Sequence, residues 1–122
     1  MLKHLIIFFS LILFTLNSVA QAHKSCEKLP ASFPSYESAM QQIKGAKFKI
    51  SETIDTRKSS WIRGLSYLSC DGKSGFMIMT TDSKSYIHQD VPIEIWNDLK
   101  SADSFGTYYN EKIKHQYRIS IK

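Results

Sequence analysis

The sequence predicts an α+β domain, with a mainly antiparallel sheet of three to five strands and two or three helices packed on one face of it. Two observations predict this class. Apolar residues recur at helical spacing in residues 36–43 and 91–102, and between these segments they recur in short stretches bounded by turn residues. No internal repeat, linker or low-complexity tract interrupts residues 23–122, so we expect one domain.

Residues 1–22 predict a secretory signal peptide. Lys3 precedes an uncharged apolar run at 5–16, which is shorter than the roughly 20 residues that a membrane-spanning helix needs. The tripeptide Ala-Gln-Ala at 20–22 has the small residues that signal peptidase accepts, so His23 is the expected first mature residue. We therefore expect a secreted or periplasmic protein with no stable membrane insertion after cleavage.

The two cysteines, Cys26 and Cys70, predict one disulfide, because export places their thiols in an oxidising compartment. Chain entropy gives such a bridge about 4 kcal/mol of stabilisation. A lipid-modified Cys26 is the alternative. It needs small apolar residues just before the cysteine, and the chain has His23, Lys24 and Ser25 there.

An amphipathic helix is predicted after an extended lead-in at 23–34, which holds two prolines. Ser35 can cap this helix, and Gly45 stands where a helix usually ends. Its apolar positions have i, i+3, i+4 and i+7 spacing. They are Tyr36, Ala39, Met40 and Ile43.

Alternation of Phe48, Ile50 and Ile54 with polar residues predicts a half-buried strand next. Glu52 interrupts its apolar face. A sheet edge is the commonest place for such a carboxylate, and a partner cation or a bulge are the alternatives. The polar run at 55–60 predicts a connecting loop.

Three further strands are predicted at 61–69, 76–81 and 85–89. The pairs Asp71-Gly72 and Asp82-Ser83 supply the turns between them. The middle strand is apolar at successive positions, which is typical of a central strand covered on both faces.

A second helix is predicted to begin at Asp90 or Val91, with Pro92 in its first turn. Its expected buried side consists of Val91, Ile95, Leu99 and Ala102, with Trp96 alongside. A turn at 104–106 should follow. The spacing of Tyr109, Ile113 and Tyr117 predicts a short third helix, and residues 117–121 then alternate as in a last strand.

A series of short motifs runs from about Ser59 to Tyr117. The motifs are Ser59-Ser60-Trp61-Ile62, Tyr67, Tyr86, Val91-Pro92, Ala102-x-Ser104-x-Gly106 and Tyr108-Tyr109-Asn110-x-x-Ile113-Lys114-x-x-Tyr117. In their order and spacing they together resemble the KTSC domain family, whose central Tyr-x-Tyr is Tyr86-Ile87-His88 here. That family is named after the C-terminal extension of some lysyl-tRNA synthetases and also occurs as a stand-alone bacterial domain. Its function is unknown, and RNA binding has been suggested for it.

Cationic and aromatic side chains near the C-terminus form the candidate binding site. The chain has 16 Lys and Arg against 11 Asp and Glu, a formal net charge of +5, which suits an anionic partner and serves solubility equally well. Cations beside aromatic rings suit anionic ligands such as a phosphate backbone, whereas a solvated basic face over packed tyrosines is the plainer interpretation. The candidate residues are Tyr86, His88, Tyr108, Tyr109, Asn110, Lys112, Lys114 and Arg118.

Two other interpretations involve histidines and aromatic residues. His88 and His115 could serve as general base and acid in a ribonuclease, although a half-buried His88 is more often structural. Trp61, Tyr67 and Tyr86 could form a recognition strip or pack as cross-strand pairs, and packing is the default.

We therefore predict a small non-catalytic binding or interaction domain. Its expected partner is an anionic ligand or another exported protein, and export argues against nucleic acid. We predict no cofactor and no metal, since the disulfide occupies the cysteines that zinc would use. A copper site at an exposed His23 amine is the chemically allowed alternative.

Overall fold

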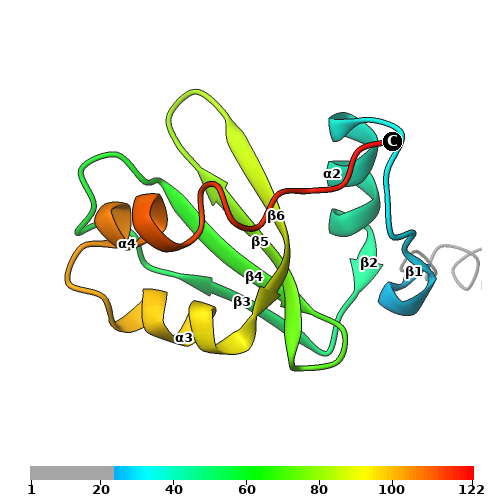
Figure 1. Ribbon diagram of the computed structural model, residues 1–122, viewed down its shortest axis with the longest axis horizontal. Coiled ribbons are helices and arrows are strands. Elements are labelled where there is room, and N and C mark those ends of the chain that lie inside the picture. The colour runs from blue at the N-terminus through cyan, green and yellow to red at the C-terminus, as the bar shows by residue number, and fades with distance from the viewer. Residues whose placement is uncertain (1–23) are drawn as a thin grey trace, which may run out of the picture.

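A computed structural model describes residues 24–122. It has the predicted α+β class, with three α-helices, a four-stranded antiparallel sheet and a two-stranded parallel sheet in this part of the chain (Figure 1). The predicted signal peptide at 1–22 lies outside the described residues. Across residues 24–122, no helix combines the length and the apolar character that crossing a membrane requires.

The large sheet has its strands in chain order, so each pairs with the next. Its strands are β3 (Ile50–Ile54), β4 (Gly64–Ser69), β5 (Ser74–Thr80) and β6 (Ser85–Pro92). The helices are α2 (Tyr36–Lys44), α3 (Ile93–Ser101) and α4 (Phe105–Lys112). Near the N-terminus, β1 (Lys24–Ser25) pairs in parallel with β2 (Ala46–Lys47), and the 3-10 helix η2 (Cys26–Lys28) follows β1.

Helix α2 confirms the prediction made from residues 36–43. The Ser35 side chain caps it by accepting a hydrogen bond of 3.1 Å from the backbone N–H of Ser38. Gly45 follows its last turn, and Ala39 and Ile43 are buried. The disulfide Cys26–Cys70 is also present and joins η2 to the residue after β4.

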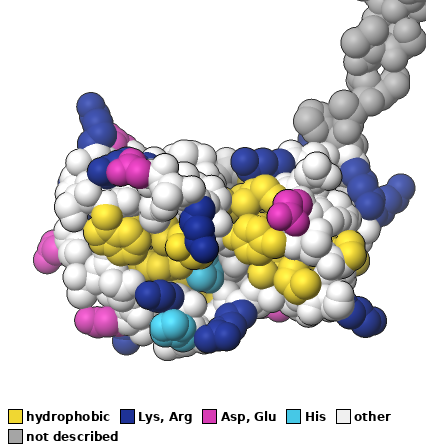
Figure 2. Space-filling model, turned by 90° about the horizontal axis from the view of Figure 1, so that it is seen from above, with side chains coloured by type: hydrophobic (Ala, Val, Ile, Leu, Met, Phe, Trp, Pro, Cys, Tyr) yellow, Lys and Arg dark blue, Asp and Glu magenta, His cyan; other side chains and the backbone are white. Residues whose placement is uncertain are grey.

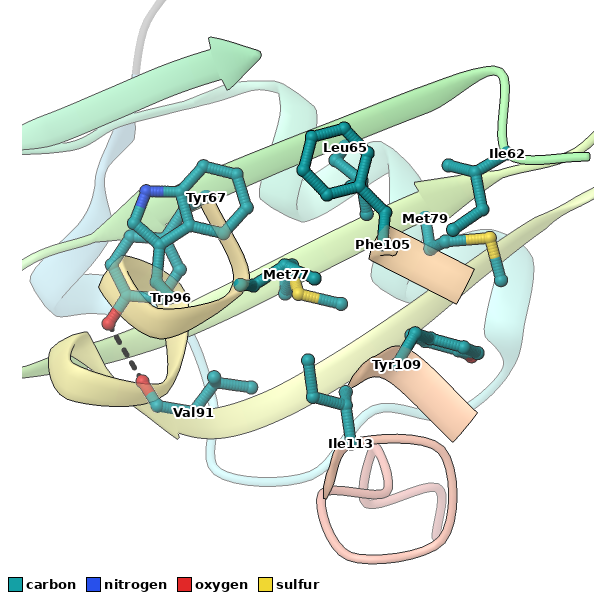
Figure 3. Close-up of a cluster of buried hydrophobic side chains, with 11 residues drawn as sticks. Ile62, Leu65, Tyr67, Met77, Met79, Val91, Trp96, Phe105, Tyr109 and Ile113 are labelled. Carbon is teal, nitrogen blue, oxygen red and sulfur yellow. Dashed lines mark hydrogen bonds between the residues drawn. The ribbon is translucent and has the colours of Figure 1, made fainter. Parts of the chain in front are cut away.

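Helices cover both faces of the large sheet, and the prediction that they pack on one face is wrong. Helices α3 and α4 cover one face, where the larger core cluster lies (Figure 3), and α2 covers the other. The reason lies in β5, the predicted central strand, whose Met77 and Met79 face one side and Ile78 the other, all buried. The first cluster includes Leu65, Tyr67, Trp96, Leu99 and Tyr109, and the second includes Phe33, Ala39, Ile43 and Ile87.

Glu52 lies on β3 at the edge of the sheet, as predicted, and it also meets a cation. Its carboxylate accepts hydrogen bonds from the Trp96 indole N–H and, at 3.0 Å, from the Lys100 ammonium. These two bonds lower the pKa of Glu52 from its ordinary 4.5. The Glu52 side chain thus connects α3 to β3 by hydrogen bonds.

Both predicted turns are present. The Asp71 carboxylate accepts backbone N–H bonds of 2.8 Å from Lys73 and 3.1 Å from Ser74, and Gly72 adopts a φ of 80° that favours glycine. At the next turn, the Thr81 N–H donates to the Lys84 carbonyl at 2.8 Å. This pairing fixes the register of β5 against β6.

The first predicted strand of this group starts too early. Residues 61–63 lie outside β4, because the Ser59 side chain accepts hydrogen bonds from the N–H groups of Trp61 and Ile62. These bonds fold the segment into a local turn before β4 begins.

The boundaries after residue 90 also differ from the prediction. Val91 and Pro92 belong to β6, with Pro92 in extended conformation as the N-cap of α3. The predicted turn at 104–106 is instead the start of α4, whose Ser104 cap accepts from the Thr107 N–H at 3.2 Å.

The end of the chain forms no regular strand among the described residues. Helix α4 ends at Lys112, before Tyr117. The segment after it crosses over β6 toward α2 (Figure 1), where an isolated bridge joins Ile121 to Phe33 and the Ser120 N–H donates to the Gln89 side chain at 2.8 Å.

Candidate functional site: a pocket between β6 and α4

A pocket opens between β6, α4 and the segment that follows α4. Its volume is about 410 Å³, near the small end of the range for ligand pockets. We call it the β6–α4 pocket. It is lined by Trp61, Met79, Thr81, Tyr86, His88, Tyr109, Asn110, Lys114, His115 and Arg118.

Most of the candidate binding residues lie in this pocket. Those that line it are Tyr86, His88, Tyr109, Asn110, Lys114 and Arg118. Tyr108 and Lys112 do not line it. Tyr108 packs against the core cluster, where burial first and then the nearby Asp98 raise its pKa above 10.0, and the Lys112 side chain is exposed on α4.

Met79 was not among the candidate residues, although the sequence carries a signal for it. The turn Asp82-Ser83 sets the hairpin register, and that register places Met79 opposite Tyr86 and Met77 opposite His88. Side chains opposite each other lie on one face, so Met79 belongs beside Tyr86. Thr81, just before this turn, also lines the pocket.

His88 is buried and has a partner on each ring nitrogen. Its Nδ1 lies 2.8 Å from the Tyr117 carbonyl oxygen and its Nε2 lies 2.7 Å from the Tyr109 hydroxyl. A carbonyl only accepts, so we assign the proton of the neutral ring to Nδ1. The Tyr109 hydroxyl then donates to Nε2, and the ring joins β6, α4 and the C-terminal segment.

Burial shifts the pKa values of this pair in the directions that keep both neutral. It lowers the pKa of His88 below its ordinary 6.5, an effect that the Tyr117 carbonyl partly opposes. Burial also raises the pKa of Tyr109 to about 12. Near neutral pH, the pair is therefore an uncharged hydrogen-bonded unit.

The aromatic rings of the pocket pack edge to face. The Tyr109 ring centroid lies 5.2 Å from that of His88 and 6.0 Å from that of Trp61, with interplanar angles of 69° in both pairs. Trp61 in turn lies against Gly106, where a Cβ atom would meet the indole. Tyr67 is absent from this group. It stacks on Trp96 at 5.3 Å and donates to the Val91 carbonyl at 2.7 Å (Figure 3).

Cations border the pocket and carboxylates do not. Lys114 and Arg118 contribute positive charge, and none of the described residues that line the pocket is Asp or Glu. Figure 2 shows hydrophobic side chains beside histidine, Lys and Arg side chains on this part of the surface. The arrangement suits a ligand that carries both an apolar part and negative charge.

A comparison with models of protein families tests the resemblance to the KTSC domain family. Residues 77–117 match the model of the KTSC domain family. This part of the chain is therefore similar to the KTSC domain family. The match begins in β5, so the similarity suggested by residues 59–67 stays a prediction. No curated protein matches the chain.

Residues 77–117 include most of the residues that line the pocket. Tyr86 and His88 are two residues apart on β6, so their side chains lie on the same face of the sheet. Trp61 and Arg118 line the pocket from outside residues 77–117. Among residues 24–122, no three His, Cys, Asp or Glu side chains are grouped to hold a metal ion.

Proposed function

We propose that this KTSC-like domain is an exported, non-catalytic binding module whose β6–α4 pocket takes an anionic ligand with an apolar part. One observation carries the proposal. Most of the residues that the sequence suggests for binding line one pocket, which is bordered by Lys114 and Arg118 and by no carboxylate of the described chain. Such a border attracts anions and disfavours cations.

The disulfide supports export. A bridge between Cys26 and Cys70 persists in oxidising compartments and is rare in the cytosol. Mass spectrometry of protein from its native host tests this part of the proposal. We expect a mature amino terminus near His23 and no free thiols, and an intact Met1 would contradict it.

The hydrogen bonds of His88 favour binding over RNA cleavage. A general base needs a free lone pair near the substrate, and Nε2 of His88 already accepts from Tyr109. His115 lines the same pocket with an exposed side chain. Acid–base catalysis by two histidines needs a second imidazole with an available nitrogen, and His88 does not provide one. RNA cleavage that disappears in both His88→Ala and His115→Ala would favour the enzyme instead.

A pair of matched fluorescent probes tests the pocket. The anion 8-anilinonaphthalene-1-sulfonate has apolar rings and one negative charge, and N-phenyl-1-naphthylamine is its neutral counterpart. We expect the double variant Lys114→Ala/Arg118→Ala to bind the anion about fivefold more weakly than wild type. Its affinity for the neutral probe should stay unchanged. Added salt should weaken only the anion's binding.

Lys112→Ala is the matched control, since Lys112 is an exposed lysine of α4 that does not line the pocket. It should change the affinity for the anion by less than about twofold. An equal loss in Lys112→Ala, or the same affinity for both probes, would show that general surface charge or stickiness explains the binding.

A further inference from the structure

A second pocket adjoins the β6–α4 pocket at Tyr86. It encloses about 500 Å³, and we call it the α2–β6 pocket. It is lined by Tyr36, Met40, Lys44, Lys84, Ser85 and Tyr86. Tyr86, which is 36% exposed, lines both pockets and so forms a wall between them. A ligand longer than one pocket can therefore cross this ring and enter both.

The charge of the two pockets has one sign. Lys44 and Lys84 border the α2–β6 pocket, as Lys114 and Arg118 border the other. Among the described residues that line either pocket, none is Asp or Glu. A ligand that spans both pockets therefore meets positive charge in each of them, and charge complementarity favours an acidic ligand.

Between these cations, the walls of the α2–β6 pocket are mainly apolar. The Tyr36 hydroxyl is already used, because it donates to the Ser85 carbonyl at 2.9 Å. Its ring and the Met40 side chain remain to contact a ligand. The surface suits an aliphatic or aromatic side chain better than a sugar, whose hydroxyl groups need many polar partners.

The ring faces of both pockets are poorly placed for stacking nucleic-acid bases. Tyr109 is edge to face with Trp61 and with His88, so these rings cover one another. The Lys84 ammonium lies 4.9 Å from the centroid of the Tyr86 ring and covers one of its faces. Single-stranded nucleic acid needs open aromatic faces for successive bases, and these contacts leave fewer faces open.

We propose that the two pockets together bind one acidic peptide segment, which places an apolar side chain in each pocket and its carboxylates near the four cations. The inference rests on the proposed function, because it includes the β6–α4 pocket. It adds the class of ligand and the second half of the site.

Synthetic acidic peptides with fluorescent labels test the inference by anisotropy. Each probe is an octapeptide of Asp and Glu with two leucines separated by one, two or three acidic residues. The controls carry one leucine, or lysines in place of the acidic residues. We expect at least one two-leucine probe to bind about tenfold more tightly than the one-leucine probe, and the basic probe to show no binding.

Variants on the two sides of Tyr86 separate this inference from the proposed function. Lys44→Gln/Lys84→Gln should weaken the two-leucine peptide about fivefold and leave binding of 8-anilinonaphthalene-1-sulfonate in the β6–α4 pocket unchanged. The matched control is Lys28→Gln/Lys73→Gln, a pair of exposed lysines that line neither pocket, and it should change neither affinity.

Peptide affinity that depends on Lys114 and Arg118 but not on Lys44 and Lys84 would overturn the inference and leave the proposed function intact. Failure of both the peptides and the small anion would overturn both. Tighter binding of oligouridylate or polygalacturonate than of every acidic peptide, lost in the same variants, would replace the peptide by a nucleic acid or an acidic polysaccharide.

Discussion

The hydroxyl of Tyr109 lies 2.7 Å from Nε2 of His88, and this bond joins α4 to β6 inside the core. The other ring nitrogen of His88 holds the Tyr117 carbonyl at 2.8 Å. One imidazole therefore fixes both the helix that borders the pocket and the segment that carries Arg118. The shape of the β6–α4 pocket depends on a polar pair that is itself buried.

A double-mutant cycle measures this bond. Tyr109→Phe leaves Nε2 of His88 buried without its donor, so we expect the free energy of unfolding to fall by about 1–2 kcal/mol. His88→Ala should cost more, because it also removes packing and leaves the Tyr117 carbonyl without its donor. The double variant should show a coupling energy of about 1 kcal/mol in urea denaturation.

Tyr86→Phe is the control for the cycle, since the Tyr86 side chain is exposed at 36%. Its free energy of unfolding should stay within about 0.5 kcal/mol of wild type. Strict additivity of His88→Ala and Tyr109→Phe would mean that the two side chains act separately.

Stability should depend on pH through His88. Burial lowers its pKa in the folded state below 6.5, so the unfolded chain takes up the proton first as the pH falls. The contribution of His88 to the free energy of unfolding is then fully present above about pH 6.5, and it declines as the pH drops toward the lowered pKa. Urea denaturation between pH 8 and pH 5 measures the decline.

The histidine responsible can be identified by substitution. His88→Gln should flatten this part of the pH profile, whereas His115→Gln, at an exposed position, should leave it as in wild type. A profile that flattens only in His115→Gln would contradict the assignment.

Local patterns in the sequence predicted the parts of the fold that local chemistry controls. The Ser35 cap, the helix that follows it and the central strand around Ile78 all have signals within a few residues. The start of α4 does not. Glycine disfavours a helix, so Gly106 indicated a turn. The structure has a helix there, in which the indole of Trp61, which is distant in sequence, packs against the glycine and leaves no room for a side chain.

The candidate site likewise has some residues that the sequence predicts and others that it does not. The cations and aromatic rings near the C-terminus could be selected from composition, and the hairpin register could have added Met79. The partners of His88 could not be predicted, because Tyr109 and Tyr117 reach it only through the packing of α4 on the sheet. The α2–β6 pocket had no sequence signal, since it depends on α2 lying on the opposite face.

Gly106→Ala tests the contact with Trp61. Alanine is the better helix former by about 1 kcal/mol, which alone would stabilise α4. Its Cβ would lie 2.9 Å from Cε2 of Trp61, so the indole must move. We expect a net loss of about 1–2 kcal/mol in the free energy of unfolding, together with a shifted Nε1–H resonance of Trp61.

Gly64→Ala is the matched glycine substitution in β4, where the new Cβ would make ordinary contact with Thr80 at 3.4 Å. It should leave the Trp61 resonance in place. If Gly106→Ala were as stable as wild type with the same resonance, the indole would not pack on this glycine.

Reduction of the disulfide should destabilise the domain without changing the large sheet. Cys26 and Cys70 are 44 residues apart, and closing a loop of that length gives about 4 kcal/mol in the chain-entropy model, an upper figure when reduced chains keep some structure. We expect the midpoint of urea unfolding of the wild type to move to a lower urea concentration when a phosphine reductant is added. Cys26→Ser/Cys70→Ser should show the lower stability with or without the reductant.

Hydrogen exchange should locate the effect of reduction. Because η2 and β1 lose their covalent link to β4, exchange should rise first at 24–28, whereas Met77 and Ile78 in the central strand should stay protected. Titrated free thiols with unchanged stability would show that the bridge constrains nothing in the unfolded chain.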